Sequence, residues 1–113
     1  MTTQYYNNNK VAGEITTDQV PLAADTYFDG MPLKYNSTTH VYEYSEVGSE
    51  LAGIIMLDPQ VDSRVLSAAG FGTIIKGGKV FVDCLVDGDG DPLTIDEDFI
   101  AATALNGFYF ERR

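Results

Sequence analysis

Residues 70–113, GFGTIIKGGKVFVDCLVDGDGDPLTIDEDFIAATALNGFYFERR, decide the fold of this chain. Two short apolar runs, 73–76 and 79–82, flank a Gly-Gly pair, which is a strong signal for a tight turn between two strands. The aromatic segment 108–110 reads as a closing strand. The pattern therefore predicts a β-hairpin turning at Gly77 and Gly78, followed by a loop, a helix and a last strand.

The helix of this stretch is marked at both ends. Thr94 and Glu97 have the spacing of a capping box, and Asp96 and Asp98 suit the positive end of the helix dipole. Asn106–Gly107 ends the pattern, since glycine readily adopts the left-handed conformation that closes a helix. We predict one short helix near the C-terminus.

This helix is apolar nearly all round, which indicates burial on more than one side. Packing within the core and contact with another subunit both account for that pattern. The residues that would form a subunit contact are Phe99, Ile100, Ala104 and Leu105.

Upstream, strands are expected at 25–28, closed by an Asp29-Gly30 turn, and on either side of a two-residue turn at 36–37. Pro32 lacks an N–H group, so the segment 31–35 is either an edge strand or a strand that starts after the proline. The apolar run 51–57 reads as a buried strand.

Segment 58–69 is less regular, and its apolar residues are compatible with one or two turns of helix before a bend at 68–72. The fold class is therefore mainly β with one short C-terminal helix (α+β), in a single domain over residues 18–113. No internal repeat or second domain is apparent in the sequence.

Residues 1–17 form a polar segment with little to bury, which we expect to be a flexible arm, since ordering a backbone costs about 1–2 kcal/mol per residue. It is either a frayed terminus or an arm that orders on a partner by adding a strand to a sheet edge. In the second case the contacting residues would be Thr2, Thr3, Gln4, Tyr5, Tyr6, Val11 and Ile15.

A net charge of −10 on 113 residues argues against a nucleic-acid partner, because such partners are bound mainly through Lys and Arg. No run approaches the roughly 18 apolar residues of a membrane-spanning helix, so no membrane partner is expected. The N-terminus lacks the pattern of a secretory signal, and a single cysteine excludes an internal disulfide.

No catalytic, cofactor or metal site is expected. Asp87, Asp89 and Asp91 have the start of a calcium-loop pattern, but Pro92 and Asp98 replace the turn glycine and the closing glutamate. We therefore read this loop as a glycine-rich turn.

His40 and Cys84 are residues of types that can serve in catalysis. His40 stands without an accompanying nucleophile motif. Cys84 lies among apolar residues and reads as a buried thiol.

Three segments together resemble the head decoration proteins of tailed bacteriophages. They are DTYFDGMPLKYN (25–36), GTIIKGGKVFVD (72–83) and LVDGDGDPLTIDEDFIAATALNGFYF (85–110). The resemblance implies a compact β-tulip or β-clip domain that is not an enzyme and carries no cofactor. It also implies a homotrimer that binds the major capsid protein at local three-fold sites on the outer capsid surface, with an N-terminal arm adding a strand, after assembly in the host cytoplasm.

Two readings from other classes remain. One is a small β-rich carbohydrate- or ligand-binding module, with Tyr27, Tyr35, Tyr42 and Tyr44 as its platform. The other is an enzyme subunit centred on Cys84 or His40. A trimer with a protease-sensitive arm would favour decoration, whereas a monomer with an aromatic groove would favour the ligand module.

Overall fold

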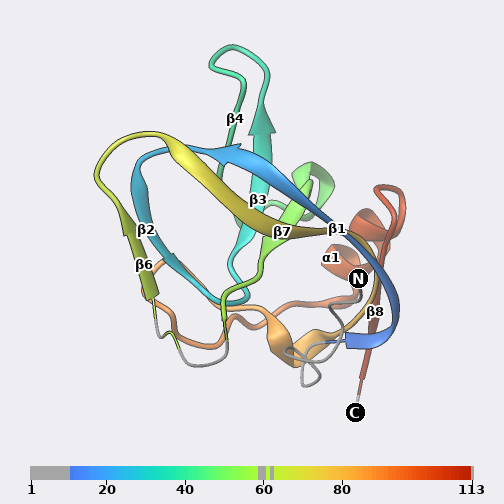
Figure 1. Cartoon of the computed structure of the whole chain (residues 1–113). Coiled ribbons are helices and arrows are strands. Elements are labelled where there is room, and N and C mark those ends of the chain that lie inside the picture. Colours follow the sequence, from blue (N-terminus) through green and yellow to red (C-terminus); the bar gives the residue numbers. More distant parts are fainter. Residues whose placement is uncertain (1–10, 59–60, 62, 113) are drawn as a thin grey trace.

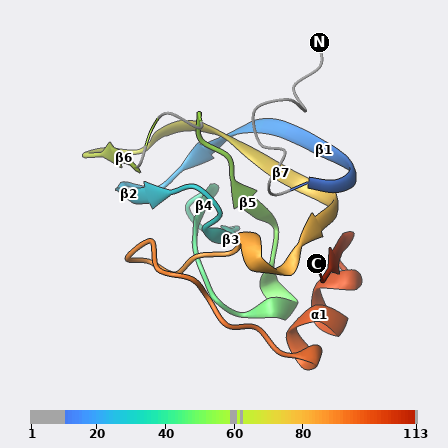
Figure 2. The same cartoon turned by 90° about the horizontal axis from the view of Figure 1, so that it is seen from below.

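A computed structural model describes residues 11–58, 61 and 63–112 of the chain. Within that part, the protein is mostly strand, with one α-helix near its C-terminus (Figures 1 and 2). The elements are β1 (Val11–Leu22), β2 (Asp25–Phe28), β3 (Pro32–Asn36), β4 (Val41–Tyr44), the 3-10 turn η1 (Gly48–Glu50), β5 (Gly53–Ile55), β6 (Ser63–Leu66), β7 (Gly70–Phe81), the 3-10 turn η2 (Val82–Cys84), α1 (Glu97–Ala104) and β8 (Phe108–Glu111).

The main sheet closes on itself. Its strand order is β1-β4-β3-β5-β7-β8, and β1 also pairs antiparallel with β7, so the first five strands form a ring. Figure 1 shows β1 and β7 running side by side across the molecule. The shortest pairing in the ring is the parallel one between β1 and β4, in which Leu22 lies opposite Tyr42. A hydrogen bond of 3.0 Å from the Ala23 N–H to the Tyr42 carbonyl accompanies it.

Two apolar clusters lie on opposite faces of this sheet, because neighbouring residues of a strand point to opposite faces. Ile55 and Ile74 pair and belong to an inner cluster, to which every strand of the ring contributes. Ile54 and Ile75 pair and belong to an outer cluster, against which Phe99 of α1 packs. The apolar run 51–57 is thus confirmed as a buried strand, although the strand itself is shorter.

The predicted hairpin at Gly77 and Gly78 is wrong, because both glycines lie within one continuous strand, β7, which pairs with β1. At Gly78, φ is +120°, and a Cβ atom there would lie 2.3 Å from the Glu14 carbonyl oxygen. The register also shifts at Lys76, which is skipped in the backbone pairing with β1 because Thr16 is opposite Gly77 and Thr17 is opposite Ile75. The glycines therefore permit a bulge and a close approach of two backbones, a role that glycine fills as readily as it fills a turn.

The predicted hairpin of β3 and β4 is confirmed, but its turn is longer than two residues, since Asn36 pairs with Val41. The His40 N–H donates to the Asn36 carbonyl over 2.8 Å, and His40 has a φ of +60°. Pro32 is the first residue of β3, a position that tolerates proline. The edge-strand alternative is wrong, because β3 lies between β4 and β5.

The β2 strand and the turn at Gly30 are as predicted. The helix considered for 58–69 is wrong where the structure describes that segment: Ser63–Leu66 forms β6, which pairs antiparallel with β2. A helix of one or two turns is marginal on its own, whereas pairing with β2 satisfies the backbone groups of the segment. The bend falls at Ser67 and Ala68, and β7 begins at Gly70.

The predicted C-terminal helix is confirmed, with a different N-terminal cap. Asp96 is the capping residue, and its carboxylate accepts a hydrogen bond of 2.9 Å from the Phe99 N–H. The capping box at Thr94 is therefore wrong, because the helix starts two residues later than that box requires. Gly107, with a φ of +91°, ends the helix as predicted, and β8 follows, parallel to β7.

The predicted arm over residues 1–17 is wrong from residue 11 onward, since Val11 to Thr17 lie in β1 and pair with β7. The cause is the glycine pair of β7, which lets this polar segment gain backbone pairing without burying many side chains. The domain therefore includes residues 11–17. Residues 1–10 lie outside the described residues.

Candidate functional site

The predicted partner-binding residues of the arm are divided by the structure. Thr2, Thr3, Gln4, Tyr5 and Tyr6 lie outside the described residues. The backbone of Val11 pairs with Val80, and the half-buried Ile15 packs against the outer cluster. Ile15 therefore serves the core of its own domain.

The predicted subunit contact on the helix is also divided. Phe99 packs against the outer cluster, with its ring centroid 6.1 Å from that of Phe110. Ile100 and Ala104 are half-buried. Leu105, at the C-terminal end of α1, is 88% exposed. Core packing thus explains Phe99, whereas Leu105 is left as an apolar side chain facing outward.

A groove of about 510 Å³ lies between the β3–β4 hairpin and the segment from η1 to β5, with Asn106 among its lining residues. One wall is held by Asn106, whose side-chain amide donates to the carbonyls of Ser49 and Leu51 over 3.0 and 3.1 Å. The lining residues are Lys34, Tyr35, Asn36, Ser37, Ser49, Glu50, Leu51, Ala52 and Asn106. The sequence does not indicate this groove. The pair Asn106–Gly107 predicts only a helix end, and the two carbonyls to which Asn106 donates belong to residues more than fifty positions away.

The groove also exposes an unpaired stretch of strand edge. β5 pairs with β3 only at Pro32 and Leu33, and the Ala52 N–H donates the last bond, to the Leu33 carbonyl over 2.8 Å. Backbone groups alternate in direction along a strand, so the N–H and C=O of Tyr35 point the same way as those of Leu33, away from β4. They therefore face the groove beyond the end of β5.

The two charged side chains that line the groove each interact with a side chain outside the lining. Lys34 lies 3.7 Å from Glu43 on the neighbouring strand. Glu50 accepts a hydrogen bond of 3.1 Å from the Ser45 hydroxyl. The lining contains one lysine and one glutamate, and the Glu43 carboxylate lies close to that lysine.

Of the four tyrosines considered as a ligand platform, Tyr27 is buried, whereas Tyr35 lies on β3 and Tyr42 and Tyr44 lie on β4. The Tyr27 hydroxyl donates to the Ala23 carbonyl over 2.6 Å, and burial raises the pKa of Tyr27 to about 12. The Tyr44 hydroxyl donates to Glu46, and burial followed by this hydrogen bond raises the pKa of Tyr44. Only Tyr35 and Tyr42 stand together as a ring pair, with centroids 5.1 Å apart.

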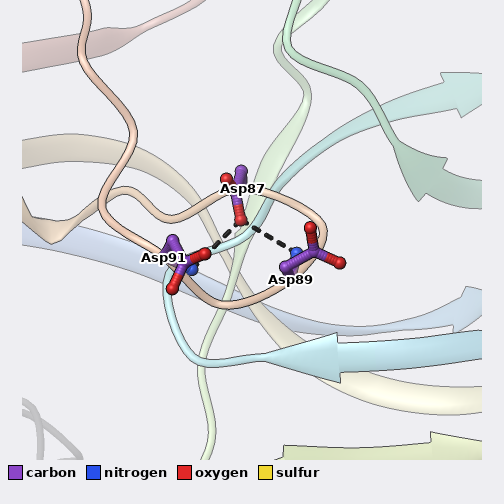
Figure 3. Close-up of side chains that lie close together, drawn as sticks. All are labelled: Asp87, Asp89 and Asp91. Atoms are coloured by element: carbon purple, nitrogen blue, oxygen red, sulfur yellow. Dashed lines mark hydrogen bonds between the residues drawn. The ribbon is translucent and has the colours of Figure 1, made fainter.

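The acidic loop is an ordered turn. Figure 3 shows Asp87 accepting backbone hydrogen bonds from Asp89 and Asp91, at 2.8 and 3.0 Å through the same carboxylate oxygen. Carboxylate oxygens of the three residues lie within 4.8 Å of one another. The turn itself is confirmed, and the expected absence of a specific metal site stays a prediction.

His40 and Cys84 occupy different surroundings. His40 is exposed in the β3–β4 turn, where its Nδ1 atom lies 3.2 Å from the Tyr35 hydroxyl. Cys84 belongs to η2 and is buried in the outer cluster, which confirms it as a buried thiol.

No helix in the described part of the chain is long and apolar enough to cross a membrane. A scan against models of known protein families finds no match, and a search among curated proteins finds none either.

Proposed function

We propose that this protein decorates the head of a tailed bacteriophage. It binds the outer surface of the expanded capsid as a trimer at local three-fold sites and stabilises the shell against the pressure of packaged DNA. The observation that carries the proposal is the order and spacing of three segments, 25–36, 72–83 and 85–110, which resemble the decoration family. The finer β-tulip or β-clip class of the domain is part of the same proposal.

The fold supports this proposal at a coarse level. The family consists of β-rich domains with little helix, and the described chain is mostly strand with an eight-residue α1. The net charge of −10 suits a protein that faces away from DNA. Its partners would be the major capsid protein and further copies of itself.

The mechanism is thermodynamic. A ligand that binds only one conformation of a shell stabilises that conformation by mass action. A protein that bridges neighbouring capsid subunits in the expanded head therefore raises the free energy needed to disrupt it. Several weak contacts on one trimer add through effective concentration, because the first contact holds the others near their sites.

The shell contact is proposed to involve Thr2, Thr3, Gln4, Tyr5 and Tyr6. These residues precede β1, which pairs with β7 from Val11 onward and so gives the segment a fixed point of attachment. Ten residues reach at most roughly 36 Å when fully extended. An added strand at the edge of a capsid sheet is the binding mode expected of such a segment.

The test uses expanded heads that lack the protein. We expect the full chain to co-sediment with such heads, to appear at three-fold positions by electron microscopy and to raise their disruption temperature. A chain lacking residues 2–10 should keep its fold and lose most binding. Failure of the full chain to bind expanded heads would contradict the function, whereas unchanged binding of the shortened chain would remove only the role of the arm.

A deletion of residues 2–15, compared with the deletion of residues 2–10, distinguishes the role of the arm from that of β1. It removes Ile15 from the outer cluster and the first paired residues of β1, so we expect a clear loss of thermal stability that the shorter deletion does not cause. Equal stability of the two shortened chains would show that β1 is dispensable up to residue 15.

A further inference from the structure

The pair Asn106–Gly107 joins the end of α1 to β8 and has the sequence of a reactive site. Asparagine followed by glycine is especially prone to deamidation, because glycine has no side chain that keeps its backbone nitrogen away from the asparagine carboxamide. The chain has five asparagines, and Asn106 alone precedes a glycine. Its side chain is exposed, so water can reach the pair.

Deamidation at this pair needs only the chain and water. The Gly107 nitrogen, after losing its proton to the solvent, attacks the carboxamide carbon of Asn106. The new C–N bond closes a succinimide ring, and the side-chain nitrogen leaves as ammonia. One water molecule then opens the ring at either of its carbonyls, which leaves aspartate or isoaspartate at position 106.

In the folded chain, both reacting groups are engaged in other bonds. The side-chain amide of Asn106 donates to the carbonyls of Ser49 and Leu51 over 3.0 and 3.1 Å, which ties the carboxamide to the segment between η1 and β5. The Gly107 N–H donates to the Ala104 carbonyl over 3.2 Å. Ring closure requires these bonds to break, so its rate should follow the population of a locally opened helix end.

The product cannot make the bonds that Asn106 makes. A carboxylate has no N–H to donate, and its negative charge would face the carbonyl oxygens of Ser49 and Leu51. Isoaspartate also adds a methylene to the backbone, directly before the φ of +91° with which Gly107 ends the helix. Phe99 would still pack against the outer cluster, so the loss concerns the C-terminal end of α1.

We propose that Asn106 is a deamidation site that the fold protects, and that its conversion releases the end of α1 from residues 49–51. The modification adds a negative charge to a chain that already carries −10, and it removes the tie that holds one wall of the groove. It is independent of the proposed function, because it involves no partner.

The protection is tested by following the reaction in the full chain. The protein is incubated at mildly alkaline pH, folded or unfolded in urea, and mass spectrometry of the peptide around position 106 measures deamidation and isoaspartate. We expect Asn106 to react at least about 10-fold faster in the unfolded chain. In urea, Asn36, which precedes Ser37, should react more slowly than Asn106. Equal rates at Asn106 in the two states, or faster reaction at Asn36, would overturn the proposal.

The release is tested with two variants that carry the same added charge. Asn106→Asp reproduces the deamidated side chain, whereas Leu105→Asp places a carboxylate at the neighbouring position, which is 88% exposed, and keeps the bonds of Asn106. We expect the melting temperature to fall by at least about 4 °C for Asn106→Asp and by no more than about 2 °C for Leu105→Asp.

Hydrogen exchange locates the change within the folded chain. The amides of residues 103–107 should exchange at least about 5-fold faster in Asn106→Asp than in the unaltered chain, while those of β1 and β7 keep their protection. Leu105→Asp is the control for the added charge. Unchanged exchange at residues 103–107, or the same acceleration in both variants, would contradict the release of the helix end.

Discussion

Gly78 is the residue on which the pairing of β1 with β7 depends. Its φ of +120° is rare for side-chain-bearing residues, and a Cβ atom would lie 2.3 Å from the Glu14 carbonyl oxygen and 2.6 Å from the Ile15 Cα. Both neighbours are backbone atoms, so neither can move aside without shifting β1. Strain of this kind costs about 1–3 kcal/mol for the φ angle alone.

Gly78→Ala should therefore lower the free energy of unfolding by at least about 2 kcal/mol, as measured by urea denaturation. Gly70→Ala is the matched control in the same strand, because its new methyl group would make ordinary contacts, with the Leu66 side chain at 3.5 Å and the Ala68 carbonyl oxygen at 4.0 Å. We expect the control to change stability by no more than about 0.5 kcal/mol. Equal effects of the two substitutions would show that the close approach at Gly78 does not matter.

Tyr27 links stability to pH in the alkaline range. Its folded-state pKa is raised from 10.0 to about 12, first by burial and then by Asp25 and Glu43. A raised pKa means that folding favours the protonated phenol, so this stabilisation is complete below pH 10 and is lost as pH rises toward 12. The free energy of unfolding should accordingly fall between these values.

Tyr27→Phe removes both the titrating group and the hydrogen bond to Ala23. At pH 8 it should cost about 1 kcal/mol, and its stability should then decline less steeply above pH 10 than that of the unaltered chain. Part of the decline should remain, because the pKa of Tyr44 is also raised. Denaturation at a series of pH values measures the free energy of unfolding of both proteins. If this free energy declined equally steeply in the two, Tyr27 would not be responsible for the decline.

At the scale of elements, the start of α1 distinguishes two capping arrangements. The Asp96 carboxylate accepts from the Phe99 N–H, whereas Thr94 lies outside the helix and is exposed. Asp96→Ala should destabilise the protein by about 1 kcal/mol in urea unfolding, and Asp96→Asn by much less, because asparagine also caps well. Thr94→Ala should have little effect. If Thr94→Ala destabilised the protein more than Asp96→Ala, Thr94 would be the capping residue.

At the scale of the whole molecule, the net charge of −10 should attract cations diffusely, including at the acidic loop. One oxygen of Asp87 already accepts two backbone bonds, and selective calcium binding needs about 6–8 well-placed oxygens. EDTA should therefore leave the melting temperature unchanged. Calcium should act no more strongly than a monovalent salt of equal ionic strength. A saturable micromolar calcium site in calorimetry would contradict this, and Asp98→Ala would be the first variant to test.

Local signals determined several elements in advance. Asn106–Gly107 marks the end of α1, the alternating residues of β4 mark a strand beside the β3 turn, and the apolar run around Ile54 and Ile55 marks a buried strand. Each of these depends on the conformational preferences or the burial of a few consecutive residues. The pattern of strand and turn signals, with one helix signal, likewise indicated a mainly β chain with one helix.

Tertiary structure alone decided which segments pair. Gly77 and Gly78 permit either a turn or a close approach of two backbones, and only the presence of β1 selects the second. Residues 11–17 become a strand, and 63–66 pair with β2, for the same reason: a distant partner satisfies their backbone groups. The groove lined by Asn106 arises likewise from contacts between Asn106 and residues more than fifty positions away. Pairing partners remote in sequence leave no local pattern. The sequence therefore determined the elements that carry their own signals, such as the end of α1, and the folded chain determined the strands at 11–17 and 63–66 and how all the elements meet.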